Sequence, residues 1–135
     1  DIGVEAATEH SPDDNEMFRV TGISAHDNVI KDCNGLCGLC FGGYNGSRGF
    51  TEKCEFYNNT LIDNGTQVIV QRSKDNSIHD NLFVGGDTEI EYNSDCAAED
   101  MINDFRHNVW RRDGSSVLDG MKSKIRGIGS GFVPE

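Results

Sequence analysis

Proline and basic residues are scarce in this sequence, and it contains no long apolar run. Only two of the 135 residues are proline, Pro12 and Pro134. Lys and Arg number 12 against 23 Asp and Glu, so the formal net charge is −11, which excludes a protein that tracks nucleic-acid phosphates. No apolar run approaches the roughly 18 residues that a membrane span needs. The N-terminus lacks the basic-then-apolar layout of a signal peptide, so we expect any such segment to have been removed or never to have been part of this sequence.

Glycine, Asn and Asp are abundant instead. The sequence has 16 glycines, and all three residue types tolerate the left-handed backbone of tight turns. Hydrophobic residues make up only 36%, but seven Phe, three Tyr and one Trp are spread along the chain, which argues against disorder. The composition therefore indicates one ordered domain that is acidic and rich in turns and β-strands.

Four segments share one layout, with an apolar residue three positions before an Asn and another two positions after it. The four residues are Asn28, Asn59, Asn81 and Asn108, at steps of 31, 22 and 27 residues. A glycine and then a short strand-like run follow each segment. Four residues beyond each glycine comes an aliphatic residue, and these are Leu39, Ile69, Ile90 and Leu118.

This repeat predicts an all-β chain whose short parallel strands stack about 4.8 Å apart, with the aliphatic residues on a buried central spine. An Asn at the same corner of every repeat can hydrogen-bond to the repeats above and below it. Helical periodicity occurs only around residues 97–102, where it is enough for a turn or two.

The corner Asn59-Thr60-Leu61-Ile62-Asp63-Asn64-Gly65 and the run from Gly35 to Tyr44 resemble the repeats of right-handed parallel β-helices in the pectate-lyase-like superfamily. The resemblance covers about residues 1–120 and implies a right-handed parallel β-helix of four to five coils that forms part of a longer helix. Residues 121–135 are then a C-terminal strand or linker. The remaining coils or domains of the longer chain are expected partners.

The same resemblance implies a secreted or cell-surface bacterial protein that acts on or binds a polysaccharide, expected to be acidic. This fold carries lyases, hydrolases, isomerases and non-catalytic surface proteins. Two functions therefore stay open. One is a carbohydrate-active domain, and the other is a non-catalytic module that uses the β-helix as a rigid platform.

If Ala6 joins the aliphatic spine, Glu9 aligns with Gly42 and Arg72 on the outward face, with about 10 Å between the two charged side chains. Lyases of this kind need a base and a positive charge, and hydrolases need two carboxylates. We therefore predict Glu9, Arg72 and His10 as catalytic residues if the chain is a polysaccharide lyase or glycoside hydrolase. The alternative is that Glu9 and Arg72 form an ordinary solvated pair.

The expected substrate groove lies beside these residues. Gly42 and Gly43 would form a shelf on which a sugar could stack against Tyr44. Arg48 and Lys74 lie on flanking loops, so we predict Tyr44, Arg48 and Lys74 as substrate-binding residues.

A second acidic set suggests calcium. Alternating residues place Glu89 and Glu91 on one face of a predicted strand, where hard Ca²⁺ would suit their oxygens. Simple surface acidity is the alternative interpretation. Three of the four histidines lie beside the repeated Asn, so we interpret them as repeat residues rather than catalysts.

The five cysteines allow a weaker hypothesis. The spacing of Cys33, Cys37 and Cys40 matches radical S-adenosylmethionine enzymes, but the chain is too short for their barrel, and strand alternation puts Cys37 and Cys40 on opposite faces. Buried cysteines that act as small hydrophobes fit better. If a disulfide forms, Cys33–Cys54 is the first pair to check.

Overall fold

The computed structural model describes residues 2–8, 19–43, 49–111 and 132–134, and these form three parallel sheets. Sheet A contains β1 (Ile2–Thr8), β5 (Cys37–Gly43), β9 (Thr66–Val70) and β12 (Thr88–Tyr92). Sheet B contains β2 (Arg19–Thr21), β3 (Ser24–His26), β6 (Phe50–Glu52), β7 (Glu55–Tyr57), β10 (Ser73–His79) and β13 (Met101–Arg106). Sheet C contains β4 (Val29–Lys31), β8 (Thr60–Ile62), β11 (Leu82–Val84), β14 (Asn108–Arg111) and β15 (Phe132–Pro134).

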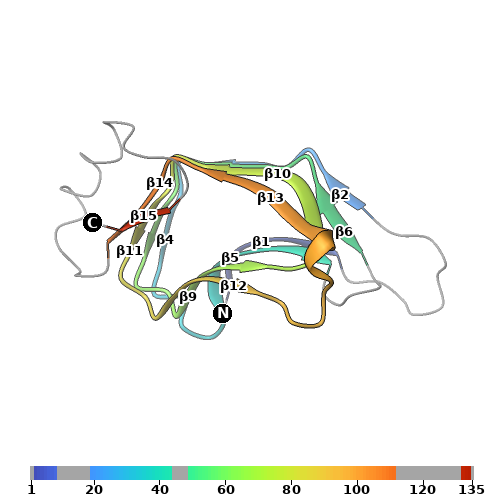
Figure 1. Cartoon of the computed structure of the whole chain (residues 1–135). Helices are drawn as coiled ribbons and strands as arrows, with labels where there is room; N and C mark the ends of the chain where they lie inside the picture. Colours follow the sequence, from blue (N-terminus) through green and yellow to red (C-terminus); the bar gives the residue numbers. More distant parts are fainter. Residues whose placement is uncertain (1, 9–18, 44–48, 112–131, 135) are drawn as a thin grey trace.

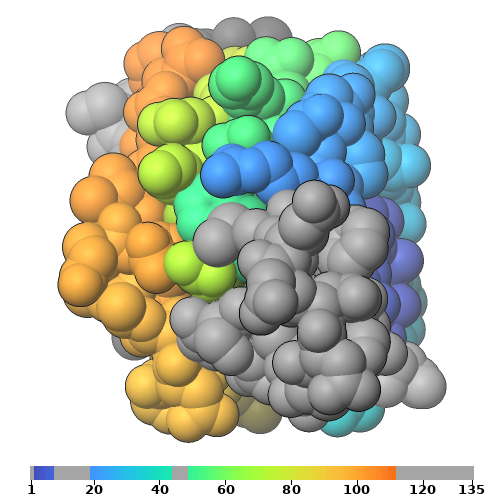
Figure 2. All heavy atoms as spheres, turned by 90° about the vertical axis from the view of Figure 1, so that its right-hand side faces the viewer, coloured from blue at the N-terminus to red at the C-terminus, as the bar shows by residue number. Residues whose placement is uncertain are grey.

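The chain visits the sheets in a fixed order, from sheet B to sheet C to sheet A, and then returns to sheet B one strand further along. Figure 1 shows the three sheets as walls around a common interior. In Figure 2, seen from the side of β2 and β6, successive circuits of the chain form bands that run from orange to blue. The predicted all-β architecture of parallel, stacked strands is confirmed.

Left-handed residues mark the corners of each circuit. Residues with φ between 48° and 58° precede the B–C corner at Asp27, Asn58, Asp80 and His107, and they recur at the C–A corner at Asp32 and Asp63. Most of these residues are Asp or Asn, which adopt this backbone at low cost. The abundance of the two residue types therefore has a geometric cause.

The four repeated Asn residues form a ladder at the B–C corner. Asn28 Nδ2 donates to Asn59 Oδ1 at 2.9 Å, and Asn59 and Asn81 each donate in the same way to the next Asn, both at 3.0 Å. Asn59, Asn81 and Asn108 are buried. Their amides satisfy backbone groups that the corner would otherwise leave unpaired, and the predicted ladder is confirmed.

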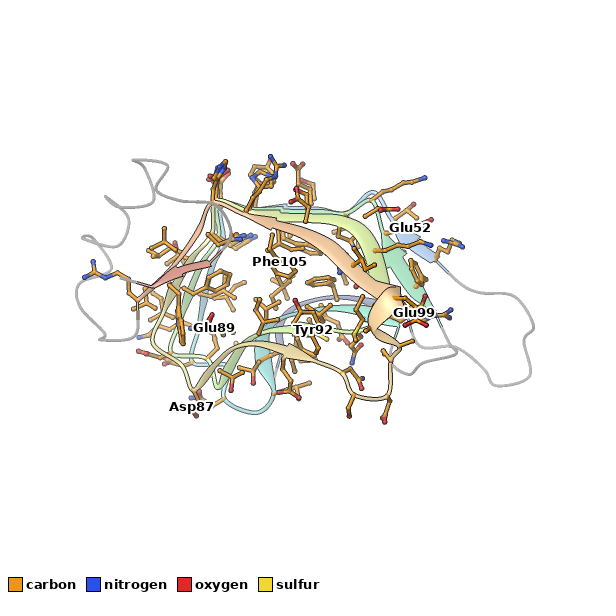
Figure 3. The ribbon with its side chains drawn as sticks, in the orientation of Figure 1. Glu52, Asp87, Glu89, Tyr92, Glu99 and Phe105 are labelled. Carbon is orange, nitrogen blue, oxygen red and sulfur yellow. The ribbon has the colours of Figure 1, made fainter. Side chains whose placement is uncertain are left out.

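The core lies between the sheets and consists of columns of apolar side chains, one residue from each strand. The register stacks Val4, Leu39, Val68 and Ile90 in sheet A, Ala25, Phe56, Ile78 and Phe105 in sheet B, and Ile30, Leu61, Phe83 and Trp110 in sheet C. Figure 3 shows Phe105 pointing into the space between the sheets. Phe41 stacks on Phe56 across this space, with ring centroids 5.2 Å apart.

The predicted spine was wrong at one position within the described residues. Ile69 pairs with Cys40 and packs outside the central core, and Val68 is the residue that pairs with Leu39. The predicted fourth member, Leu118, lies outside the described residues. Because Val68, Ile69 and Val70 are all apolar, hydrophobicity alone could not choose between the two faces of β9.

The physical cause is the place of the glycine at the corner. Gly35 and Gly86 each lie two residues before the first residue of the next strand, whereas Gly65 directly precedes β9. Counting four residues from Gly65 therefore reaches Ile69, one position beyond the residue that pairs with Leu39. The predicted alignment of β1 was also wrong, because Ala6 pairs with Phe41 rather than with Leu39, and Ala7 rather than Glu9 aligns with Gly42.

The only helical element among the described residues is the short 3-10 helix η1 (Ala98–Asp100), and the strand β13 begins directly after it. None of the described helical residues builds a helix long and apolar enough to cross a membrane.

Candidate functional site

The outer face of sheet B carries most of the candidate functional side chains that the structure describes. Of the predicted site residues, Arg72 directly precedes β10 and Lys74 is the second residue of that strand. The remaining predicted catalytic and substrate-binding residues, Glu9, His10, Tyr44 and Arg48, lie outside the described residues.

Three cations surround one aromatic ring at the β2–β6 end of this face. The charged groups of Arg19, Arg72 and Lys74 lie 5.3, 5.5 and 5.3 Å from the centroid of the Phe50 ring. The ring itself is only 2% exposed. We call Arg19, Phe50, Arg72 and Lys74 the cation cluster. The negative face of the ring attracts the three charges, which keeps them together despite their mutual repulsion.

Two carboxylates orient the cation cluster. Glu52 lies 2.9 Å from Arg19, and Asp100, from η1, accepts a hydrogen bond from Arg72 Nε at 3.1 Å. Figure 3 shows Glu52 at the end of sheet B that carries β2 and β6. The Arg72 side chain is only 14% exposed, and Asp100 and the Phe50 ring hold its guanidinium in place.

A hollow of about 510 Å³ lies in the middle of the face, where β10 bends. Register between β10 and β13 shifts at this bend, because residues 75 and 76 in β10 face a single residue of β13. Ile102 contributes an apolar side chain that is 64% exposed. The lining residues are Asp75, Asn76, Ser77, Ile102, Asn103, Asp104 and Arg106.

Stacked rings form a column beyond the hollow. His26 stacks on Tyr57 with centroids 4.7 Å apart, and Tyr57 stacks on His79 at 5.3 Å with nearly parallel planes. We call these three residues the ring ladder. They come from β3, β7 and β10, one circuit apart, and the pairing register places them directly over each other.

The last ring is held by two carboxylates. Asp80 lies 2.7 Å from His79 Nδ1, and Glu55 lies 2.9 Å from His79 Nε2. Carboxylates only accept hydrogen bonds, so both contacts are hydrogen bonds when the imidazole carries a proton on each nitrogen.

Sequence reasoning treated the histidines as repeat residues, and it missed both Phe50 and the ring ladder. A signal was available, since His26, Tyr57 and His79 all lie two positions before a repeated Asn. Two residues that are two positions apart lie on the same face of a straight strand. Here a left-handed residue lies between each ring and the following Asn, so the ring and the Asn do not share a face.

The two predicted calcium ligands are separated in the structure. Glu89 lines one hollow with Ile90 and Trp110, whereas Glu91 lines another with Ile69 and accepts a hydrogen bond from Thr66 Oγ1 at 3.4 Å. Figure 3 shows Glu89 pointing toward the space between the sheets and Asp87 pointing away from it. Glu89 and Glu91 therefore do not form the shared site, because β12 does not alternate regularly between these two residues.

The cysteines also depart from the prediction. All five are free thiols, so no Cys33–Cys54 disulfide forms. The backbone of Cys33 bonds to Asn64 at the C–A corner, whereas that of Cys54 bonds to Asn76 within sheet B, so the two belong to different corners.

Cys37 and Cys40 were expected on opposite faces, but they pack in one cluster. Strand alternation fails between them. Leu39 belongs to the central core, and a Cβ built on Gly38 would meet Leu61 Cδ2 in the interior at 2.9 Å. Because the consecutive residues Gly38 and Leu39 both face the interior, Cys37 and Cys40 both lie on the outer side of β5.

Comparisons with known proteins leave the family open. No protein-family model matches the chain, and no solved structure matches it. The chain is similar to YwoF, an uncharacterized protein of Bacillus subtilis strain 168, with 29% identity over 120 residues. The similarity covers 84% of this chain but 24% of YwoF, so the chain spans about a quarter of the length of the curated relative that it matches.

Proposed function

We propose that the chain is a right-handed parallel β-helix of the pectate-lyase-like kind that binds an acidic polysaccharide along the outer face of sheet B. The fold proposal is supported by the constant order of sheets in every circuit and by the left-handed residues and Asn ladder at recurring corners. We further propose that residues 1–120 form the coils of this domain.

One observation carries the binding proposal, namely the cation cluster on an otherwise acidic chain. Arg19, Arg72 and Lys74 gather around Phe50 although the formal net charge is −11. The two carboxylates that contact Arg19 and Arg72 leave this group with a local excess of one positive charge. A local positive patch attracts an anionic chain even when the protein as a whole is acidic, and salt weakens that attraction.

The hollow and the ring ladder extend the surface across several strands. The exposed Ile102 offers an apolar contact for a sugar ring, while Asp104 and Arg106 offer hydrogen-bonding groups for its hydroxyls. A polysaccharide that crosses the strands would meet the same spacing, about 4.8 Å, at every circuit. Such a surface suits a repeating ligand better than a compact one.

The geometry favours binding over catalysis at Arg72. Phe50 and Asp100 hold this guanidinium in place, and a guanidinium does not lose its proton in proteins. The catalytic and the secreted or cell-surface assignments stay predictions that rest on the family resemblance.

Binding to polygalacturonate, with a neutral glucan as the comparison ligand, tests the proposal. We expect the double variant Arg72→Gln/Lys74→Gln to lose about tenfold or more in affinity, because charge-assisted contacts are worth roughly 1.5–3 kcal/mol each. Lys31→Gln is the matched control, since this exposed lysine pairs with Asp32 on sheet C and lies outside the face. Equal affinity of the wild type for both glycans would contradict the proposal.

The same mixtures decide between a binding module and a lyase. Ultraviolet absorbance of unsaturated products, followed with Ca²⁺ and with a chelator, reports cleavage. We expect binding without product formation. Product that depends on Ca²⁺ would instead support the lyase prediction.

A further inference from the structure

A second hollow, of about 280 Å³, lies on the outer face of sheet A. Figure 1 shows sheet A as the wall opposite sheet B, so this hollow has no part in the proposed polysaccharide surface. Two apolar residues, Leu36 and Ile69, line part of it. The other lining residues are polar or aromatic, namely Gln71, Glu91, Tyr92, Asn93 and Ser94.

The side-chain amide of Gln71 is buried in this hollow without a partner. Gln71 is only 7% exposed, and because the preceding Val70 packs in the central core, Gln71 faces outward. Its backbone N–H donates to the Phe41 carbonyl at 2.9 Å, and its carbonyl accepts from Ser73 Oγ at 2.8 Å. Within residues 2–8, 19–43, 49–111 and 132–134, nothing hydrogen-bonds to the side-chain amide. Buried amides are normally paired, so this one points to a ligand.

The charge around the hollow is negative. The charged residues in the four strands of sheet A are Glu5, Glu89 and Glu91, and these strands contain no Lys or Arg. Glu91 lines the hollow and accepts one hydrogen bond, from Thr66 Oγ1 at 3.4 Å. No cationic side chain that the structure describes pairs with Glu91. The hollow therefore favours a cation.

The carboxylate and the amide lie on either side of an apolar contact. Glu91 pairs with Ile69 in the register of β12 and β9, and Gln71 lies two positions beyond Ile69. Strands are about 4.8 Å apart and rise about 3.3 Å per residue, which puts the backbones of Glu91 and Gln71 roughly 8 Å apart. Both side chains are long enough to reach one group between them.

We propose that this hollow binds an aliphatic primary amine in its ammonium form. An ammonium group has three hydrogen-bond donors and no acceptor. The Glu91 carboxylate neutralises its charge and accepts one hydrogen bond, and Gln71 Oε1 accepts another. Leu36 and Ile69 contact the alkyl chain. A free diamine and the lysine side chain of another protein share this chemistry.

Other classes of ligand fit less well. An anion would meet Glu91 and no lining cation. A metal ion needs more ligands, and the described part of the chain places no group of three or more His, Cys, Asp or Glu side chains to hold one. A neutral sugar would pair with Gln71 but leave the Glu91 charge without a counter-charge.

Calorimetric titration of the full chain with cadaverine, an aliphatic diamine, tests the proposal, with the matching pentanediol as the neutral comparison. We expect cadaverine to bind and the diol not to bind. Glu91→Gln should lose about tenfold or more in affinity, because it removes a charge-assisted hydrogen bond. Glu89→Gln is the matched control, since it makes the same change on the same strand but lines a different hollow, and it should bind as the wild type does. Equal binding of diamine and diol, or unchanged affinity in Glu91→Gln, would overturn the proposal.

Nuclear magnetic resonance of the wild type locates the amine independently of how the variants fold. The side-chain NH₂ signal of Gln71, identified by its absence in Gln71→Leu, should shift when cadaverine is added. An unmoved signal would contradict the proposed site. Gln71→Leu should bind several-fold more weakly yet unfold like the wild type, because the amide that it removes has no partner in the free protein.

Nα-acetyl-lysine methylamide separates the two sources of the amine. Tighter binding of this lysine derivative than of cadaverine would assign the hollow to a lysine of a partner protein. Tighter binding of cadaverine would assign it to a free polyamine. Absence of binding by both amines would refute the proposal and leave the polysaccharide surface on sheet B unaffected.

Discussion

Two columns of side chains stack at the same corner of the molecule, and they do different things. The Asn ladder lies inside, with Asn59 and Asn81 buried and hydrogen-bonded to circuits on both sides. The ring ladder lies two residues earlier on the outside, where the His26 side chain is 45% exposed. Stacked parallel strands repeat any residue type at a fixed spacing. Whether that repetition serves stability or binding depends on which side of the sheet the column occupies.

The largest effect should follow from breaking the inner column. In Asn81→Ala, the backbone N–H and the side-chain amide of Asn59 each lose an acceptor, and the carbonyl of Phe56 loses a donor. We expect the free energy of unfolding to fall by about 3 kcal/mol, because each unsatisfied buried group costs roughly 1–3 kcal/mol. Urea denaturation of the variant and the wild type measures this change in the free energy of unfolding.

Asn28→Ala is the control, since Asn28 is exposed and, within the part of the chain that the structure describes, bonds to a repeated Asn on one side only. We expect it to cost at most about 1 kcal/mol. Equal costs in the two variants would mean that burial does not distinguish the inner ladder.

A smaller effect should follow from breaking the outer column. Tyr57→Ala removes the ring between His26 and His79, and each stacked pair contributes about 0.5–1.5 kcal/mol. We expect a loss of about 1 kcal/mol in the same denaturation experiment. Tyr57→Phe keeps the ring and should unfold like the wild type, and a similar loss in both variants would assign the stability to the hydroxyl instead.

The smallest effect should come from Glu55→Gln. Its carboxylate contacts His79 Nε2, but the Glu55 side chain is 49% exposed, so the pair is worth about 0.5 kcal/mol or less. Unfolding at low and at high salt checks this, since the difference from the wild type should shrink with salt. A loss above about 1 kcal/mol would show that the outer column also carries substantial stability.

The repeat was enough to predict the inner column but not the outer one. An Asn that recurs between apolar residues in stacked strands is buried and needs hydrogen-bond partners. The equivalent Asn residues of the circuits above and below supply them. His26, Tyr57 and His79 share no chemistry except a flat ring, so their alignment became visible only when the register was known.

The structure brings together two residues that were predicted for separate roles. Arg72 and Lys74 lie beside Phe50 from another circuit, a residue that no motif marked. Glu89 and Glu91 separated because β12 does not alternate regularly. Cys37 and Cys40 met because two consecutive residues of β5 turn inward.

Local patterns were sufficient for the features that recur in every circuit: an acidic all-β chain, left-handed Asp and Asn corners, and an amide ladder. Each of these depends on residue type at a short spacing, and that information is written along the chain. The register of sheet A, the cation cluster and the thiol pair came from packing between circuits. One residue separates Gly35 from β5 and none separates Gly65 from β9, and this difference shifts the predicted side chains of β9 by one position relative to their neighbours across the sheet.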